Sequence, residues 1–320
     1  MDIDKEKMTG QDKKRVSIMI LNYNGRILLE ECLPSVIAAS SYNNINCEVV
    51  VIDNNSTDQS VKYIEENYPT VKIIKLKENR YLFSYNEAIK DCRSDYVVLL
   101  NNDMMAAKTF IAPLLEKMKD EKIFSVMPNI RNWDGSKYKA ESNKNRIYFK
   151  KGWIDWEDVG DDEEGITFFT CAGAAIYDRR KYLELGGFDE LYSPLYVEDV
   201  DLSYRAWKRG WVNYYEPDSV VLHKNSSTIK QFYSGKKIST LKIRNKYLFF
   251  WKNIQERELW KEHIKLILLT VIRSIIKRET TQVQAFCQAL KRVKKLKNRR
   301  NPGNTQSNRM SDADILQIFR

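Results

Sequence analysis

The sequence lacks the signals that mark exported and membrane-spanning chains. No run of residues approaches the about 20 apolar positions that a spanning helix needs. Met1 to Arg15 are charged and have no apolar centre like that of a signal peptide. The five cysteines are scattered and contain no Cys-x-x-Cys pair (Cys32, Cys47, Cys92, Cys171, Cys287). We therefore expect a cytoplasmic protein with reduced thiols and no zinc site.

An excess of positive charge is also lacking over most of the chain. Residues 1–240 hold 34 Lys or Arg against 37 Asp or Glu, whereas residues 241–320 hold 19 against 6, so the net charge of +10 belongs to the C-terminal quarter. A basic segment behind a near-neutral domain suits an anionic membrane surface or nucleic acid, although a solvated helix face has the same composition. No nucleic-acid motif is present, so we expect a membrane surface as the candidate partner and no nucleic acid.

Short apolar runs alternate with helical patterns near the N-terminus. The runs predict strands at residues 16–22, 49–52, 71–76 and 96–100, with helices between and after them at 27–37, 61–67 and 84–92. Such alternation predicts an α/β fold with a mostly parallel central sheet and helices on both faces.

Composition divides the chain into four segments. We expect a flexible N-terminal tail at 1–14, an α/β domain at 15–240, a basic amphipathic helical extension at 241–298 and a disordered tail at 299–320. The extension carries an apolar stripe backed by basic residues, which suits a helix lying on a membrane as well as one packed on the main domain. Residues 130–165 show no clear periodicity and are predicted as loops over the site.

Polar side chains follow the predicted strands at the edge where open α/β sheets bind ligands. They are Asn22 to Asn24, Asp53 to Ser56, and Asn101 to Asp103. The small residues around Gly173 would permit close approach by a substrate or by another segment of backbone.

Asn101-Asn102-Asp103 offers a carboxylate and amide oxygens to a hard divalent cation, but the local sequence taken alone favours Asp103 as the cap of a following helix. His223, one of two histidines, ends the predicted strand 219–222. It could complete the ligands of a cation or serve as a structural hydrogen-bond donor.

Three carboxylates, Glu198, Asp199 and Asp201, open a segment with helical periodicity that ends at Gly210. In the first turn they would lie near the positive end of the helix dipole, where a carboxylate stays ionised and can accept a proton. An acidic N-cap that only stabilises the helix is the alternative.

The order of these motifs resembles the family 2 glycosyltransferases of the inverting GT-A type, over roughly residues 16 to 250. The matching pieces are Val16-Ser17-Ile18 with Asn22-Tyr23-Asn24, Val51 to Asp58, Leu100 to Asp103, Ala172 to Ala175 with Arg179, Gly186 to Glu190, Glu198 to Leu202 with Arg205 and Gly210, and Val221-Leu222-His223. Asn-Asn-Asp followed by Glu-Asp-Val-Asp-Leu is similar to the rhamnosyltransferase-like branch that builds bacterial surface polysaccharides.

This resemblance implies a GT-A type nucleotide-diphospho-sugar transferase fold for residues 15–240. It implies transfer of a sugar, with inversion, from a nucleoside-diphosphate sugar to a hydroxyl of a lipid-linked saccharide, at the cytoplasmic face of the membrane. Asp199 would be the general base, supported by Glu198, Asp201 and Arg205. The residues expected to bind the nucleotide sugar are Asn22, Asn24, Asp53, Asn54, Asn102, Asp103 and Gly173, and those expected to bind Mn²⁺ or Mg²⁺ are Asp103 and His223.

Two departures from the family pattern limit what is carried over. Asn101 stands where the metal motif usually begins with Asp, which removes one charge from the metal site. The bulky segment from Asn79 to Asn86 replaces a glycine-bearing loop, so the identity of the donor is left open.

Two other functions compete with glycosyl transfer. A sugar-nucleotide nucleotidyltransferase would show a glycine-rich basic loop after the first strand, for which Asn22 to Arg26 is a poor match. A nucleic-acid-binding protein could use the basic C-terminal region, but the acidic residues 198–201 would oppose a phosphate backbone.

Overall fold

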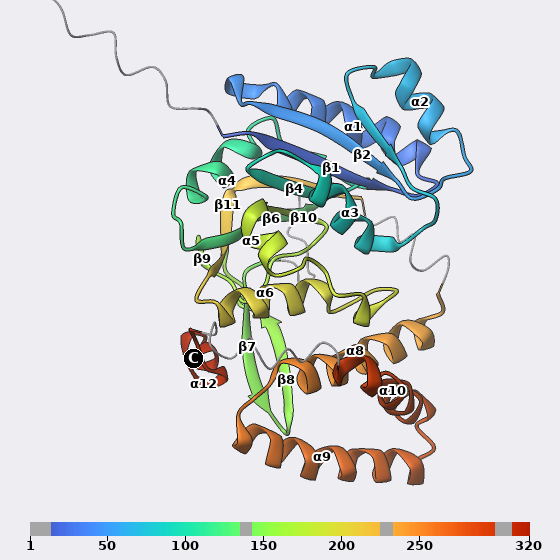
Figure 1. Ribbon diagram of the computed structural model, residues 1–320, viewed down its shortest axis with the longest axis vertical. Helices are drawn as coiled ribbons and strands as arrows, with labels where there is room; N and C mark the ends of the chain where they lie inside the picture. The colour runs from blue at the N-terminus through green and yellow to red at the C-terminus, as the bar shows by residue number, and fades with distance from the viewer. Residues whose placement is uncertain (1–13, 135–142, 225–232, 298–308) are drawn as a thin grey trace, which may run out of the picture.

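Four parallel strands form one half of the central sheet in the computed structural model, which describes residues 14–134, 143–224, 233–297 and 309–320 (Figure 1). The strands β1 (Val16–Asn22), β2 (Cys47–Asp53), β3 (Lys72–Lys75) and β4 (Tyr96–Asn101) lie in the order β3-β2-β1-β4. Their side chains alternate between two apolar clusters, Ile18 and Ile20 on one face and Met19 on the other. All four strands therefore end at one edge.

The other half of the sheet is mixed. β10 (Ala174–Asp178) runs antiparallel to both β4 and β6 (Ile123–Asn132), and β11 (Val212–His223) runs parallel to β6. Two short strands, β5 (Met104–Ala106) and β9 (Gly165–Ile166), pair antiparallel with β11. β11 consequently ends at the same edge as β1, β2 and β4.

Helices cover both faces of the sheet, because its apolar side chains point to both sides. α1 (Arg26–Ser40), α2 (Ser60–Asn67) and α4 (Ile111–Lys117) pack on one face. α3 (Ser84–Asp91), α5 (Arg179–Glu184) and α6 (Glu198–Lys208) pack on the other. Short 3₁₀ turns lie at η1 (Tyr42–Asn44), η2 (Tyr81–Phe83) and η3 (Glu190–Tyr192). The predicted fold class is confirmed.

A third apolar cluster joins α6 to the C-terminal helices. These are α8 (Gly235–Asn253), α9 (Arg257–Ile276), α10 (Thr280–Lys291), α11 (Val293–Lys297) and α12 (Asp312–Ile318). Aromatic residues dominate the cluster: Trp156, Phe168, Tyr204, Trp207, Tyr247, Phe249 and Phe250 are all buried. The helical extension is thus packed on the layer that contains α6, as Figure 1 shows.

The prediction of loops between residues 130 and 165 is wrong for much of that stretch. β6 continues to Asn132, and β7 (Asn145–Lys150) pairs with β8 (Trp153–Asp158) in a hairpin. Alternation was present in Ile147 and Phe149, and in Ile154 and Trp156, and these side chains pack in the third cluster. Frequent charges between them obscured the pattern.

The prediction of a disordered tail is wrong for residues 309–320. Asp312 has a fully buried side chain that pairs with Lys208 of α6 and accepts a hydrogen bond from Tyr204 at 2.6 Å. Phe319 packs edge-on against Trp207. Residues 299–308 and nearly all of the predicted N-terminal tail lie outside the described residues. In the part of the chain that is described, no helix is both long enough and apolar enough to cross a membrane.

Candidate active site

Amide side chains join the ends of three neighbouring strands. The parallel register sets Asn22 of β1 opposite Asp53 of β2, and Leu21 opposite Asn101 of β4. Asn102 Nδ2 donates to Asn22 Oδ1 at 2.9 Å, and Asn22 Nδ2 donates to Asp53 Oδ1 at 3.1 Å. This chain of bonds, which we call the strand-end network, fixes the three loops relative to one another before any ligand binds.

The loops after β1 and β2 are also tied to each other. Asp53 Oδ2 accepts the Ser56 N–H at 3.0 Å, and Asn24 Oδ1 accepts the Thr57 N–H at 2.7 Å. Asn24 and Asn55 have φ values of 49° and 63°, in the left-handed region that Asn tolerates better than most residues. Asn24 is exposed, so this paired turn presents an amide group to solvent at the sheet edge.

The buried side chains of Asn22 and Asn54 hold these loops in place. Both side chains are buried, with exposed fractions of 0% and 1%. Asn54 donates to the carbonyl of Tyr81 at 3.3 Å and accepts from the hydroxyl of Ser84, so it fastens the bulky segment 79–86. Both side chains that were expected to contact the nucleotide thus make hydrogen bonds within the protein.

Glycines at positions 25 and 173 allow neighbouring segments of this edge to pack closely together. A Cβ at Gly25 would stand 2.0 Å from Asn102 Nδ2, and a Cβ at Gly173 would stand 2.6 Å from Asn101 Nδ2. The Asn101 N–H donates to the Gly173 carbonyl at 2.8 Å. Of the two interpretations given for Gly173, close approach by another segment of the protein accounts for it.

Asp103 and His223 meet where β4 and β11 end. His223 pairs with Met104 across the β5–β11 ladder, which brings its Nε2 to 3.2 Å from Asp103 Oδ2. Asp103 does not cap a helix, because β5 follows it directly. The result is a carboxylate beside an imidazole at the site edge. Among the described residues, no group of three or more His, Cys, Asp or Glu side chains is gathered for a metal ion.

The turn before α6 is held in an unusual conformation. Tyr196 and Val197 have φ values of 75° and 77°, a region that costs a residue with a side chain about 1–3 kcal/mol. Val197 is the N-cap and makes no side-chain cap hydrogen bond, so the carboxylates that follow are not an acidic N-cap. Strain of this kind persists when surrounding contacts enforce it, and here it sets the direction in which Glu198 and Asp199 leave the turn.

Contacts from α8 enforce this turn. Asn245 Nδ2 lies within hydrogen-bond distance of three carbonyl oxygens, those of Tyr192, Leu195 and Tyr196, at 2.9, 3.0 and 2.7 Å. Arg244 donates to the Ser193 carbonyl at 2.7 Å. Sequence reasoning missed these residues.

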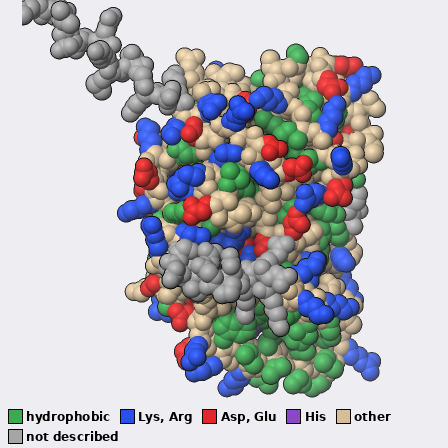
Figure 2. Space-filling model, in the orientation of Figure 1, with side chains coloured by type: hydrophobic (Ala, Val, Ile, Leu, Met, Phe, Trp, Pro, Cys, Tyr) green, Lys and Arg blue, Asp and Glu red, His purple; other side chains and the backbone are tan. Residues whose placement is uncertain are grey.

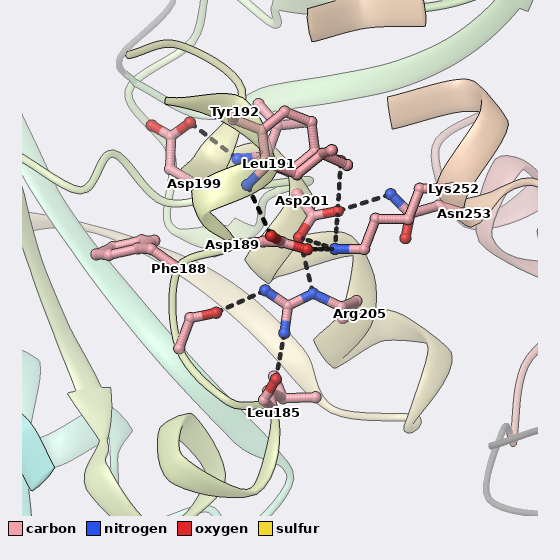
Figure 3. A network of polar contacts seen from close by, with 12 residues as sticks. Leu185, Phe188, Asp189, Leu191, Tyr192, Asp199, Asp201, Arg205, Lys252 and Asn253 are labelled. Atoms are coloured by element: carbon pink, nitrogen blue, oxygen red, sulfur yellow. Dashed lines mark hydrogen bonds and ion pairs between the residues drawn. The ribbon is translucent and has the colours of Figure 1, made fainter. Parts of the chain in front are cut away.

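Asp201 lies in a buried cluster of charges that also involves α8 (Figure 3). It accepts hydrogen bonds from Tyr192 Oη at 2.7 Å, Arg205 Nε at 2.8 Å and Lys252 Nζ at 2.8 Å, and Lys252 also pairs with Asp189 at 2.8 Å. Burial opposes its charge, but Lys252 and Arg205 outweigh burial and hold the pKa of Asp201 well below its usual range. Asp201 is therefore an ionised structural group.

Glu198 differs from Asp201 in the direction of its pKa shift. It is 3% exposed, and burial, followed by the charge of Asp199, raises its pKa well above the usual range. This direction runs against the expectation that all three carboxylates stay ionised, because burial disfavours the charged form.

Asp199 is the most exposed of the three carboxylates. It is half-buried, its Oδ1 accepts the Val200 N–H at 2.9 Å, and it points away from the Asp201 cluster in Figure 3. Burial, followed by the charge of Asp199, raises the pKa of Cys171 to about 12. Cys171 precedes Gly173 by two residues, so the charge of Asp199 acts on the segment that leads into Gly173.

The comparisons with known proteins agree with this geometry. The sequence profile described as "Glycosyl transferase family 2" matches residues 17–186, just over half of the chain. An N-acetylglucosaminyl-diphospho-decaprenol L-rhamnosyltransferase of Mycobacterium tuberculosis is 26% identical over 204 residues, which cover 55% of this chain and 66% of the relative. The chain thus spans just under two thirds of that protein's length.

Solved structures show the same fold. GalNAc-T7 with UDP, GalNAc and Mn²⁺ superimposes with a TM-score of 0.60 at 18% identity, over 76% of this chain and 48% of the other. A mannosyltransferase of Pyrobaculum calidifontis with GDP-Man and Mn²⁺ gives 0.56 at 19% identity, over 88% and 76%. The family profile and the mycobacterial relative favour glycosyl transfer over the nucleotidyltransferase and nucleic-acid alternatives. The GT-A type sheet, the polar edge and the profile match together establish that the chain belongs to glycosyl transferase family 2.

Proposed function

We propose that the protein transfers a sugar, with inversion at the anomeric carbon, from a nucleoside-diphosphate sugar to a hydroxyl of a lipid-linked saccharide. The observation that carries this proposal is the arrangement of one polar edge. The strand-end network and the Asp103–His223 pair lie at the ends of β1, β2, β4 and β11, and we infer that Asp199, in the first turn of α6, faces the same region. A donor site beside a base is what such a transfer requires.

The donor half of the proposal rests on Asn24, Asp53, Asn102 and Asp103. Asn24 is exposed, Asn102 is half-buried, and the backbone around Asp53 is held by Ser56. Groups held rigid by one another bind a ligand without first losing conformational freedom, which favours affinity. Asn22, Asn54 and Gly173 shape this surface through the contacts described above.

The pair Asp103 and His223 fits a divalent cation. A carboxylate and an imidazole are both ligands that Mn²⁺ accepts, and two protein donors leave room for phosphate oxygens of the donor. Such an ion would stabilise the charge that gathers on the departing diphosphate. The Mn²⁺ present in the GalNAc-T7 and mannosyltransferase structures supports this assignment.

Asp199 is the general base in this proposal. It takes the proton of the acceptor hydroxyl while that oxygen attacks the anomeric carbon from the face opposite the diphosphate, and the nucleoside diphosphate leaves. A positioned base contributes roughly 10²- to 10⁴-fold to such a step. The raised pKa of Glu198 favours its uncharged form beside Asp199, and Asp201 and Arg205 position α6.

A lipid-linked acceptor at the cytoplasmic face of a membrane is supported by the name of the mycobacterial relative, which specifies a diphospho-decaprenol substrate. The basic C-terminal region is compatible with such a location, since residues 241–320 contain 19 Lys or Arg and only 6 Asp or Glu.

The test separates donor binding from transfer. UDP-, dTDP- and GDP-sugars are screened by thermal shift and calorimetry, with and without Mn²⁺ or Mg²⁺. We expect one donor class to stabilise the protein in a cation-dependent way, and Asp103→Ala to remove the response. Asp199→Asn should retain donor binding but lower transfer, or donor hydrolysis in the absence of acceptor, by about 10²-fold or more.

Asp218→Asn is the matched control, because Asp218 is exposed in β11 and has no part in the site. It should leave both measurements unchanged. Binding of no nucleotide sugar by the folded wild-type protein, or full activity in Asp199→Asn, would contradict the proposal.

A further inference from the structure

An apolar surface lies on the outer side of α9. Six large aliphatic side chains on this helix are between 51% and 76% exposed: Ile264, Leu268, Leu269, Ile272, Ile275 and Ile276. Figure 2 shows hydrophobic side chains gathered at the end of the molecule where Figure 1 places α9. Scattered exposed aliphatics are ordinary, but six on one face of one helix indicate a surface that meets an apolar partner. We call them the α9 face.

The opposite side of α9 fixes the orientation of this face. His263, Ile267 and Ser274 are buried against the rest of the protein. His263 Nδ1 lies 2.6 Å from the Gly152 carbonyl in the β7–β8 turn, and Trp251 Nε1 donates to His263 Nε2 at 3.0 Å. The ring therefore donates through one nitrogen and accepts through the other. The helix is held at both nitrogens of His263, so the α9 face cannot turn inward without breaking these contacts.

Cations accompany the α9 face. Lys265, Arg273, Lys277 and Arg278 are exposed, and none of them forms an ion pair with a described residue. The exposed acids of α9 are engaged nearby, since Glu258 pairs with Lys261 at 2.6 Å and Glu262 accepts the Gly152 N–H at 3.0 Å. The charge around the apolar residues is thus positive and is not neutralised within the described structure.

We propose that the α9 face is a docking surface for an anionic lipid bilayer, with the helix lying in the plane of the headgroups. Aliphatic side chains enter the acyl boundary, and the surrounding Lys and Arg meet lipid phosphates, which is how interfacial amphipathic helices bind. A second copy of the chain on this face would bring the same cations together, while the exposed acids of α9 are already engaged by Lys261 and the Gly152 N–H. This inference deepens the proposed function by naming the surface that would carry the site to a lipid-linked acceptor.

Lipid binding can be measured without catalysis. The full-length protein is co-sedimented with vesicles of phosphatidylcholine alone and of phosphatidylcholine with phosphatidylglycerol, at low and high salt. We expect binding to the anionic vesicles that weakens with salt. The double variant Leu268→Asp with Ile272→Asp should lower the binding constant more than about tenfold. Lys265→Glu and Arg273→Glu should each lower it about fivefold on anionic vesicles.

Ile27→Asp is the matched control, because Ile27 is 70% exposed on α1, outside α9. It should leave vesicle binding unchanged, and an unchanged melting temperature would show that each variant is folded. Undiminished vesicle binding by the folded α9 double variant would overturn the proposal. So would a dimer, seen by light scattering without lipid, that the same substitutions dissociate. Neither outcome bears on donor binding, which the screen described above tests separately.

Discussion

Two polar networks hold the candidate site, and they are built differently. The strand-end network links Asn102, Asn22 and Asp53 mainly through neutral amide donors on strands that are hydrogen-bonded neighbours. The network around Asp201 is ionised and buried, and it joins α6 to Lys252 of α8, about 50 residues away in the sequence. The donor side is therefore organised by the sheet itself, whereas the side that carries Asp199 depends on a helix from the C-terminal extension.

Removing the charge of Asp201 should produce the largest difference between the two networks. Asp201→Asn keeps the shape of the side chain but leaves Lys252 and Arg205 buried without their shared carboxylate, and we expect a loss of about 3–5 kcal/mol in unfolding free energy. Asn22→Ala, in the strand-end network, should cost about 1–3 kcal/mol. Urea unfolding of both variants measures the difference. Equal losses of unfolding free energy would mean that disrupting the buried charges costs no more than disrupting the amides.

The same contrast should appear in the dependence of stability on pH. The folded-state pKa of Asp201 is depressed, so its contribution is complete above the unfolded value of about 3.9 and is lost as pH falls toward the folded value. The wild-type protein should lose this stability as pH drops below about 4, and Asp201→Asn should show a shallower acid limb. Parallel acid limbs for the two proteins would contradict the assignment.

Glu198 should make stability depend on pH in the opposite direction. Its folded-state pKa is raised, so above about pH 4.3 the unfolded chain loses a proton that the folded protein keeps. This effect lowers wild-type stability by up to about 1.4 kcal/mol per pH unit until the folded pKa is reached. Glu198→Gln should therefore become more stable relative to wild type as pH rises from 4 toward neutrality, as melting temperatures across that range would show. If instead the melting temperature of Glu198→Gln falls relative to that of wild type as pH rises, Glu198 is ionised when folded.

The smallest expected effect concerns one hydrogen bond, between the side-chain amides of Asn102 and Asn22. Gly25→Ala would set a Cβ 2.0 Å from Asn102 Nδ2, so the Asn102 side chain must move and its bond to Asn22 is lost. We expect a cost of about 0.5–1.5 kcal/mol and donor binding weakened by up to about tenfold. Gly235→Ala is the control, because a Cβ at Gly235 meets no atom within 4 Å. Calorimetric titration with the donor compares the two.

The residues of the strand-end network could be predicted from the sequence because their positions depend on short segments of the chain. Each strand is a short apolar run, and the polar residues that follow it share an edge once the strands are parallel. That reasoning placed Asn22, Asp53 and Asp103 at the ends of β1, β2 and β4, where the structure has them. It could not separate Asn22, which is buried, from Asn24, which is exposed, since that difference depends on how neighbouring loops bond to each other.

The α6 side could be predicted only in part. Helical periodicity identified α6 and its three carboxylates, but not their different surroundings, because Asp201 pairs with Lys252 and Asn253, which are 51 and 52 residues away in the sequence. One signal was available in the extension: Asn245 and Lys252 are seven residues apart, and therefore lie on one face of a helix rich in aromatic residues. Polar side chains among such neighbours are usually buried with partners.

The hydrogen bonds from Asn245 to the turn before α6 also limit how this enzyme can be divided. The family profile ends at residue 186, before that turn, and α8 begins near the predicted boundary at 240. A fragment cut there would keep the strand-end network and lose the bonds that hold the turn before Asp199. Grafting the C-terminal helices of a relative would therefore require grafting the turn and the first part of α6 with them, as a single exchangeable unit.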